Sequence, residues 1–178
     1  MKRIILFVAF VAILASPVFS QVRLDIGVDV PMNIYAVGGG EVQSSSDVGS
    51  FLKQHIFPFP EASLYYQFEV GPIKLAPGVR AFTMILESVL WPNLLMELAV
   101  EPVFIQAQLG GLLFLFFGLE NQADFGQVFF PDLSIWIGLG KERRFRLGGG
   151  LLGMYMPELT TEGMAVVPYL GGKVSLLF

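Results

Sequence analysis

Residues 22–30, VRLDIGVDV, alternate between apolar side chains and side chains that are mostly charged. Successive side chains of a β-strand point to opposite faces, so this period of two predicts a strand with one apolar face and one charged face. The class of protein depends on which face meets water. The apolar face of a soluble barrel packs inside, whereas the apolar face of a membrane barrel meets lipid and leaves the charges in the lumen.

Residues 1–20 differ from the rest of the chain and predict a secretory signal peptide. Lys2 and Arg3 precede the apolar run IILFVAFVAILA, and small residues lie before the expected cleavage site. An uncleaved anchor is the alternative, but the run is short for a membrane helix. The mature domain then covers 21–178. The absence of cysteine excludes a disulfide framework and a lipid-attachment site, which favours a bacterial envelope protein.

Alternation with a period of two recurs along the mature chain, and no later segment has the ~18 continuous apolar residues of a membrane helix. The sequence therefore predicts an all-β fold, with eight strands near 22–34, 61–70, 73–86, 94–101, 103–117, 128–139, 144–156 and 164–178. Short turns alternate with longer loops, the turns at 71–72, 101–102 and 140–143 and the loops at 35–60, 87–93, 118–127 and 157–163. Short turns on one rim and long loops on the other are typical of bacterial outer-membrane barrels.

One face of the predicted strands carries no charge. The opposite face carries six acids and six bases, which are Arg23, Asp25, Asp29, Glu69, Lys74, Arg80, Glu97, Glu101, Asp132, Arg144, Arg146 and Lys173. A charge that faces lipid at the bilayer midplane costs about 2–4 kcal/mol, whereas charges inside a narrow barrel can pair with one another. We therefore expect a lumen with a network of ion pairs and an apolar exterior, which an antiparallel transmembrane barrel provides.

A soluble lipocalin-like barrel is the structural alternative, because it also has eight strands and a signal peptide. It would place the charged face in water. That face, however, also carries many glycines, which suit a crowded lumen better than a solvated surface. The chain ends on the alternating strand GGKVSLLF, with Val174, Leu176 and Phe178 on the apolar face.

On these features the mature chain resembles the small eight-stranded bacterial outer-membrane barrels, a family that includes the transmembrane domain of outer membrane protein A, OmpX and OmpW. The resemblance implies a bacterial outer-membrane location and two partners, outer-membrane lipid and the barrel-assembly machinery. It also implies that Val174, Leu176 and Phe178 form the assembly signal. Pro77 and Pro168 depart from the family pattern, because each removes a ladder donor inside a strand. We expect bulges there.

Two short motifs match enzyme signatures without their context. Gly148, Gly150 and Gly153 fit the dinucleotide-binding pattern G-x-G-x-x-G, but they lie inside an alternating strand with no helix after it. Ser50 and Lys53 form S-x-x-K, but the companion SDN and KTG elements are absent. We expect no cofactor and no catalytic residues.

His55 is the only histidine, so the chain cannot build a metal site from histidine and cysteine ligands. A hydrolase would have to combine His55 with a serine and a carboxylate, and no such constellation accompanies it. Its neighbourhood instead predicts a short amphipathic helix against the barrel mouth, with cap candidates Ser46 and Asp47 followed by Val48, Phe51, Leu52, His55 and Ile56.

Three classes of function remain. The first is a non-enzymatic outer-membrane barrel with a structural or surface-interaction role. The second is a narrow pore or a conduit for small apolar molecules, and the third is an envelope lipid-modifying enzyme.

The long-loop rim is expected to be acidic. Its single base is Lys53, and its acids are Glu41, Asp47, Glu61, Glu87, Glu120, Asp124, Glu158 and Glu162. An acidic mouth repels anions, which excludes nucleic acid as a partner and leaves the surface ligand open.

Overall fold

The structure is a computed structural model of the 178-residue chain. It describes residues 21–38, 41–44, 58–84, 87–118, 121–125, 129–155 and 163–178. The regular elements in these ranges are β-strands. The described residues include no helix that is long and apolar enough to cross a membrane.

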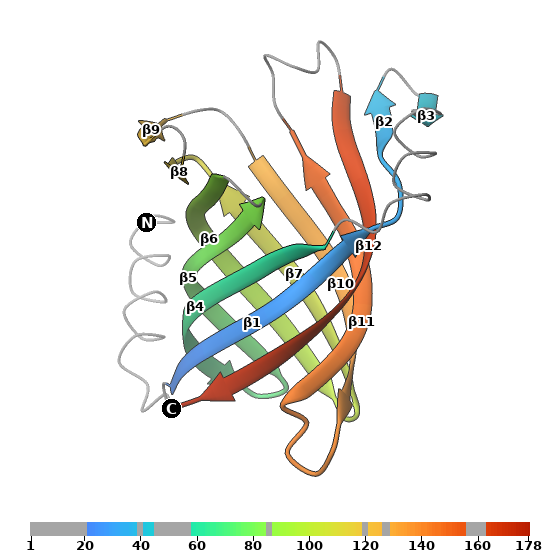
Figure 1. Cartoon of the computed structure of the whole chain (residues 1–178). Helices are drawn as coiled ribbons and strands as arrows, with labels where there is room; N and C mark the ends of the chain where they lie inside the picture. The colour runs from blue at the N-terminus through green and yellow to red at the C-terminus, as the bar shows by residue number, and fades with distance from the viewer. Residues whose placement is uncertain are drawn as a thin grey trace, which may run out of the picture.

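Eight strands close into a barrel (Figure 1). In spatial order they are β1 (Gln21–Pro31), β4 (Phe59–Val70), β5 (Ile73–Met84), β6 (Glu87–Val100), β7 (Val103–Gly111), β10 (Phe129–Leu139), β11 (Phe145–Met154) and β12 (Gly163–Leu177). Each strand pairs antiparallel with the next, and β12 pairs with β1 to close the ladder. At the closing seam the backbone N–H of Phe178 donates to the carbonyl oxygen of Val22 at 2.9 Å. The prediction of an all-β, eight-stranded antiparallel barrel is confirmed.

Two short hairpins extend the barrel at its long-loop end, which is at the top of Figure 1. β2 (Tyr35–Gly38) pairs with the upper part of β12, and β3 (Glu41–Ser44) pairs with β2. β8 (Phe114–Gly118) pairs with the upper part of β6, and β9 (Gln122–Asp124) pairs with β8. The short connections β4–β5, β6–β7 and β10–β11 lie at the opposite end. The predicted asymmetry between the two rims is therefore present.

The alternation seen in the sequence separates the outside of the barrel from its lumen. On β10, Leu133 and Ile135 are 55% and 54% exposed, whereas the alternate residues Ser134 and Trp136 are each 1% exposed. β1 follows the same pattern, with Ile26 and Val28 exposed and Asp25 and Asp29 buried. Aliphatic side chains therefore dominate the outer face, whereas charged, amide and aromatic side chains fill the interior.

Several of the predicted strand boundaries are wrong. The first strand ends at Pro31 and not at residue 34, and the predicted loop 35–60 contains β2 and β3. The segment 87–93 is not a loop, because β6 runs without a break from Glu87 and points Trp91 and Asn93 into the barrel, with Pro92 exposed outside. The predicted strand 103–117 is interrupted at Gly111 and Leu112, where φ is 133° and 74°. Backbone with positive φ cannot continue a regular strand, so the register changes here. β8 resumes the pairing with β6, but the five steps from Gly110 to Leu115 face only three steps from Asn93 to Leu90.

The two strand prolines behave differently from each other. The register of β5 is unbroken across Pro77 on both sides, so the bulge predicted there is absent. Opposite Pro168 the chain does gain one residue. Pro31 pairs with Tyr169, and Tyr35 pairs with Val166. The chain therefore takes four steps from Pro31 to Tyr35 but only three steps along β12 from Tyr169 to Val166. The bulge therefore lies in the partner strand, just where β1 gives way to β2.

Candidate functional site

Five charged side chains form a compact group in the half of the lumen nearer the short turns. This lower charged cluster consists of Arg23, Asp25, Glu97, Arg146 and Lys173, all at most 6% exposed. Arg23 Nε donates to Asp25 Oδ1 at 2.8 Å, and Arg23 Nη1 donates to Glu97 Oε2 at 2.9 Å. Arg146 Nη1 reaches the same Glu97 oxygen at 2.6 Å from the other side of the barrel. The cluster therefore ties β1, β6 and β11 together across the lumen.

Neutral polar and aromatic side chains complete this layer. Gln106 Nε2 donates to Glu97, and Gln106 Oε1 accepts from Lys173 Nζ at 2.7 Å. Lys173 Nζ also lies 4.0 Å from the centre of the Trp136 ring, and the guanidinium carbon of Arg146 lies 3.8 Å from the centre of the Phe104 ring. Aromatic faces attract cations and partly replace water around them. The lower half of the lumen is therefore filled with paired charges.

A second group lies one layer closer to the long loops. This upper charged cluster places Arg80 against Glu61, Asp132 and Asp29. Arg80 Nη2 lies 2.7 Å from Glu61 Oε2, and Arg80 Nη1 lies 2.6 Å from Asp132 Oδ2. The distance from Arg80 Nη2 to Asp29 Oδ2 is 3.6 Å, too long for a hydrogen bond. One base therefore faces three acids.

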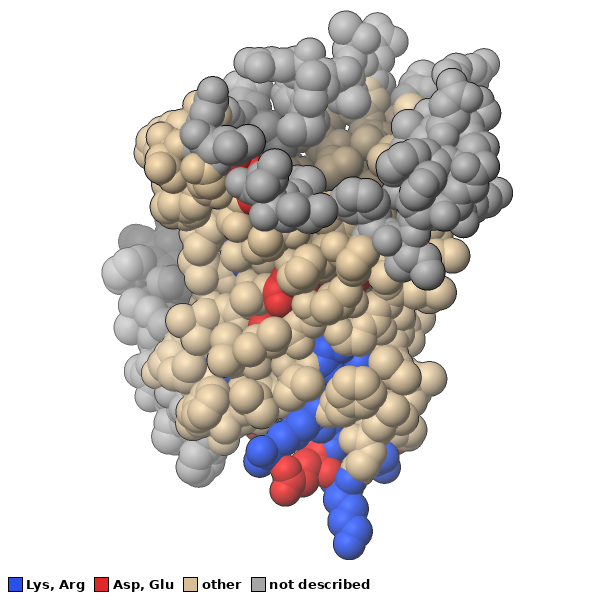
Figure 2. Space-filling model, in the orientation of Figure 1, with Lys and Arg blue, Asp and Glu red and all other residues tan. Residues whose placement is uncertain are grey.

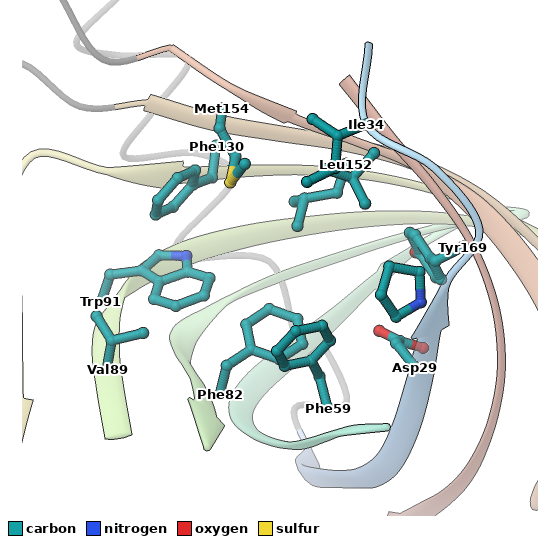
Figure 3. Close-up of a pocket in the computed structure, with 12 residues that line it drawn as sticks. Asp29, Ile34, Phe59, Phe82, Val89, Trp91, Phe130, Leu152, Met154 and Tyr169 are labelled. Carbon is teal, nitrogen blue, oxygen red and sulfur yellow. The ribbon is translucent and has the colours of Figure 1, made fainter. Parts of the chain in front are cut away.

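An apolar cavity of about 270 Å³ lies above the upper charged cluster, and we call it the cup (Figure 3). Its walls are mostly aromatic and aliphatic, and it is lined by Asp29, Pro31, Ile34, Phe59, Phe82, Val89, Trp91, Phe130, Leu152, Met154, Val167 and Tyr169. Two buried polar groups in this lining have no hydrogen-bond partner, the carboxylate of Asp29 and Nε1 of Trp91. Buried polar groups without partners are uncommon and point to a missing ligand or water.

The structure places eight of the twelve predicted lumen residues inside the barrel, and these are Arg23, Asp25, Asp29, Arg80, Glu97, Asp132, Arg146 and Lys173. The ninth, Lys74, is half-buried. Its Nζ lies 3.5 Å from Glu69 Oε1 and 4.0 Å from Glu97 Oε1.

Glu69, Glu101 and Arg144 are not lumen residues, and their predicted position is wrong. All three are exposed at the short-turn rim. Glu101 lies in the β6–β7 turn and Arg144 just before β11, where the alternation that orients side chains has ended. Arg144 instead pairs with Glu142 across 2.8 Å in the same connection.

Glu61 is a further charged residue that the sequence interpretation misplaced, in this case by leaving it out of the lumen. It was expected at the acidic long-loop rim, but it is 5% exposed and bound to Arg80 inside the barrel. Its position has the same parity as the inward-facing Ser63 and Tyr65 of β4, so extending the alternation by one pair would have found it. Trp91 was missed because its segment was assigned to a loop.

The exposed side chains over the middle of the barrel wall are largely apolar, and few charged side chains are visible there in the face that Figure 2 shows. The wall in this view is mostly uncharged, whereas Lys, Arg, Asp and Glu gather at the short-turn rim at the bottom. The predicted signal peptide, the helix near 46–56 with His55 and four of the eight predicted acids of the long-loop rim, Asp47, Glu120, Glu158 and Glu162, lie outside the described residues. In the part of the chain that is described, no group of three or more His, Cys, Asp and Glu could hold a metal ion.

No protein-family model matches the sequence, and no curated protein matches it. The solved structures similar to this chain include Neisserial surface protein A, with 8% identity and a TM-score of 0.46, covering 86% of this chain and 96% of that one. Ail, the attachment invasion locus protein of Yersinia pestis, has 8% identity and a TM-score of 0.42, covering 88% of this chain and 99% of that one. The closed ladder itself decides the architecture. The protein is an eight-stranded β-barrel, like the small outer-membrane barrels that its sequence resembles.

Proposed function

We propose that this protein is an integral barrel of the bacterial outer membrane with a closed lumen, and that its role is structural or in surface interaction rather than enzymatic. The observation that carries the proposal is the polarity of the barrel wall. Charged and amide side chains are buried inside, and large apolar side chains are exposed outside. This arrangement is the reverse of a soluble barrel and suits a lipid environment, where a closed ladder also satisfies every backbone group.

The exposed apolar side chains form a belt rather than isolated patches. Members about 40–60% exposed occur on all eight barrel strands and include Ile26, Leu64, Ile73, Val100, Ile105, Ile135, Leu147 and Leu170. A soluble monomer rarely exposes a contiguous apolar patch of more than a few hundred Å². Insertion into a bilayer would remove this belt from water.

The two charged clusters support the view that the barrel does not conduct. Eight strands leave an interior that side chains can fill, and here Arg23, Glu97 and Arg146 meet across its width. An ion crossing the lumen would have to break these buried pairs. Nucleophilic catalysis would further need a nucleophile and a base in contact, whereas Asp25, Glu61, Glu97 and Asp132 in the described lumen are each bound to an arginine. These contacts support a role that depends on the surface of the protein.

The C-terminal strand supports the proposed partnership with the barrel-assembly machinery. Val174 and Phe178 are 38% and 73% exposed on the outer face, and Leu176 is half-buried on the same face. The backbone of Phe178 pairs with Val22 at the closing seam. This strand therefore presents side chains outward at the place where the barrel closes.

A narrow conduit for small apolar molecules is the second candidate, and the cup is the observation that favours it. The charged clusters lie below the cup and block a path along the axis of the barrel. The cup therefore favours binding of a small molecule over its passage through the lumen.

Membrane fractionation and planar-bilayer recording test the proposal together. We expect the protein in the outer-membrane fraction, with a gel mobility that changes on heating because the closed barrel resists detergent unfolding. We also expect no steady conductance after insertion. Recovery as a soluble periplasmic monomer would contradict the membrane location, and a stable ohmic conductance would contradict the closed lumen.

A further inference from the structure

The floor of the cup contains a carboxylate whose hydrogen-bonding capacity is unused. Asp29 is 5% exposed, and neither of its carboxylate oxygens has a hydrogen-bond partner. Figure 3 shows its side chain at one end of the cavity, close to Tyr169. A buried carboxylate normally pairs with a cation or accepts several hydrogen bonds, because its desolvation is otherwise unfavourable. The two oxygens of Asp29 are therefore available to accept hydrogen bonds from a ligand in the cup.

The neighbouring base cannot fill that role. Arg80 directs Nε and Nη2 to Glu61 and Nη1 to Asp132, and approaches Asp29 only to 3.6 Å. Tyr169 OH also donates to Asp132, at 2.8 Å. The upper charged cluster thus has three acids for one base. A second positive charge at Asp29 would reduce this excess of negative charge.

The opposite wall of the cup suits a cation with an apolar body. The rings of Trp91 and Phe130 lie 5.0 Å apart, and those of Trp91 and Phe82 lie 5.4 Å apart, so the wall is a continuous aromatic surface. Aromatic faces attract ammonium groups and also bury hydrocarbon well. Trp91 Nε1 provides one unpartnered donor in the same wall. A cavity of about 270 Å³ limits the occupant to a small molecule.

We propose that the cup is a binding site for a small amphipathic amine, with its ammonium group on Asp29 and its hydrocarbon part against Phe82, Trp91 and Phe130. The ammonium donates to the Asp29 oxygens, and the apolar part displaces water from the aromatic wall. The carboxylate sets the preference for a cation, and the walls set the preference for an apolar body. Neutral alcohols of the same shape lack the charge, and carboxylates would be repelled by the upper charged cluster.

The two tryptophans of the chain provide an internal control for a binding test. Trp91 lines the cup with an unpartnered Nε1, whereas Nε1 of Trp136 donates to Ser134 Oγ at 2.9 Å within the lower lumen. The protein is refolded into phosphatidylcholine nanodiscs, which carry no net charge and so do not concentrate cations. Phenethylammonium, 2-phenylethanol and phenylacetate are then titrated while both indole N–H signals are followed by nuclear magnetic resonance.

We expect phenethylammonium to shift the Trp91 indole signal saturably and to leave the Trp136 signal in place. Its affinity should exceed that of 2-phenylethanol by about tenfold, as expected for hydrogen bonds to a charged group, and phenylacetate should bind weakest. Equal affinities for the amine and the alcohol would overturn the proposal. A Trp91 signal that does not move would also overturn it, as would equal shifts of both indoles.

The variant Asp29→Asn keeps the shape of the side chain and removes its charge. It should lower the affinity for phenethylammonium about tenfold and change that for 2-phenylethanol less than about threefold. Equal losses for both ligands would show that Asp29 supports the cup without recognising a cation, which would contradict the proposal. If this variant does not refold, the order of the three ligands on the unmodified protein still decides the question.

Discussion

Arg80 offers the sharpest test of the charged lumen. Its side chain is 3% exposed and contacts Glu61, Asp132 and Asp29, which come from β4, β10 and β1. It also lies 4.7 Å from the centre of the Phe82 ring. Arg80→Met keeps an unbranched apolar stem of similar length and removes the guanidinium. The three acids would then face one another without a base.

Removing one partner of a buried ion pair costs about 3–5 kcal/mol, because an uncompensated charge stays buried. Arg80 holds two carboxylates within 2.7 Å, so we expect Arg80→Met to lower the free energy of unfolding by at least about 3 kcal/mol. Adding Glu61→Gln and Asp132→Asn to Arg80→Met should restore part of this loss, since the stranded charges are then removed.

Urea unfolding in lipid vesicles, followed by tryptophan fluorescence, measures the effect. Arg144→Met is the matched control, because the ion pair of Arg144 with Glu142 is exposed and should contribute less than about 1 kcal/mol. Equal unfolding midpoints for Arg80→Met and the unmodified protein would refute the buried network. A triple variant no more stable than Arg80→Met would show that stranded charge is not the cause.

Two further predictions concern the closing seam. Gly171→Ala should destabilise the barrel by about 1–3 kcal/mol, because the added methyl would clash with Asp29 Oδ1 and lie 2.8 Å from the backbone oxygen of Val28. Gly172→Ala is the control and should be tolerated, because its added methyl would approach the flexible end of Leu147 at 3.1 Å. Equal unfolding midpoints for the two variants would contradict this packing. Phe178→Ala should reduce the heat-modifiable fraction in cell envelopes with little change in unfolding midpoint, since the side chain is 73% exposed; unchanged assembly, or a large loss of stability, would argue against a role as assembly signal.

Which face of each strand points inward could be predicted from the sequence, because alternation depends only on local backbone geometry. Asp25, Asp29 and Arg80 were placed in the lumen by parity alone, and the structure buries all three. The same rule fails where a strand ends, as it did for Glu101 and Arg144 beside the turns. It was also applied too narrowly at Glu61, which was placed at the acidic long-loop rim although it is the first residue of the predicted strand 61–70.

The cup and the pairing of charges could not be predicted in the same way. Arg80 meets Asp132 across 52 positions of the sequence, and that contact depends on the register of every intervening strand and on how the barrel closes. The change of register between β7 and β8 at Leu112 likewise needs a backbone conformation with positive φ that a leucine rarely adopts. Alternation alone contains no information on either.

The most direct test of the central claim is the lipid accessibility of two adjacent positions on β10. The chain has no cysteine, so Ile135→Cys and Ser134→Cys can each carry a single thiol label. Ile135 is 54% exposed on the outer face and Ser134 is 1% exposed in the lumen. In vesicles with brominated acyl chains, a fluorophore at position 135 should be strongly quenched, while position 134 should resist labelling in the folded barrel. Quenching at neither position, together with water exposure at 135, would contradict a membrane barrel with its charges inside.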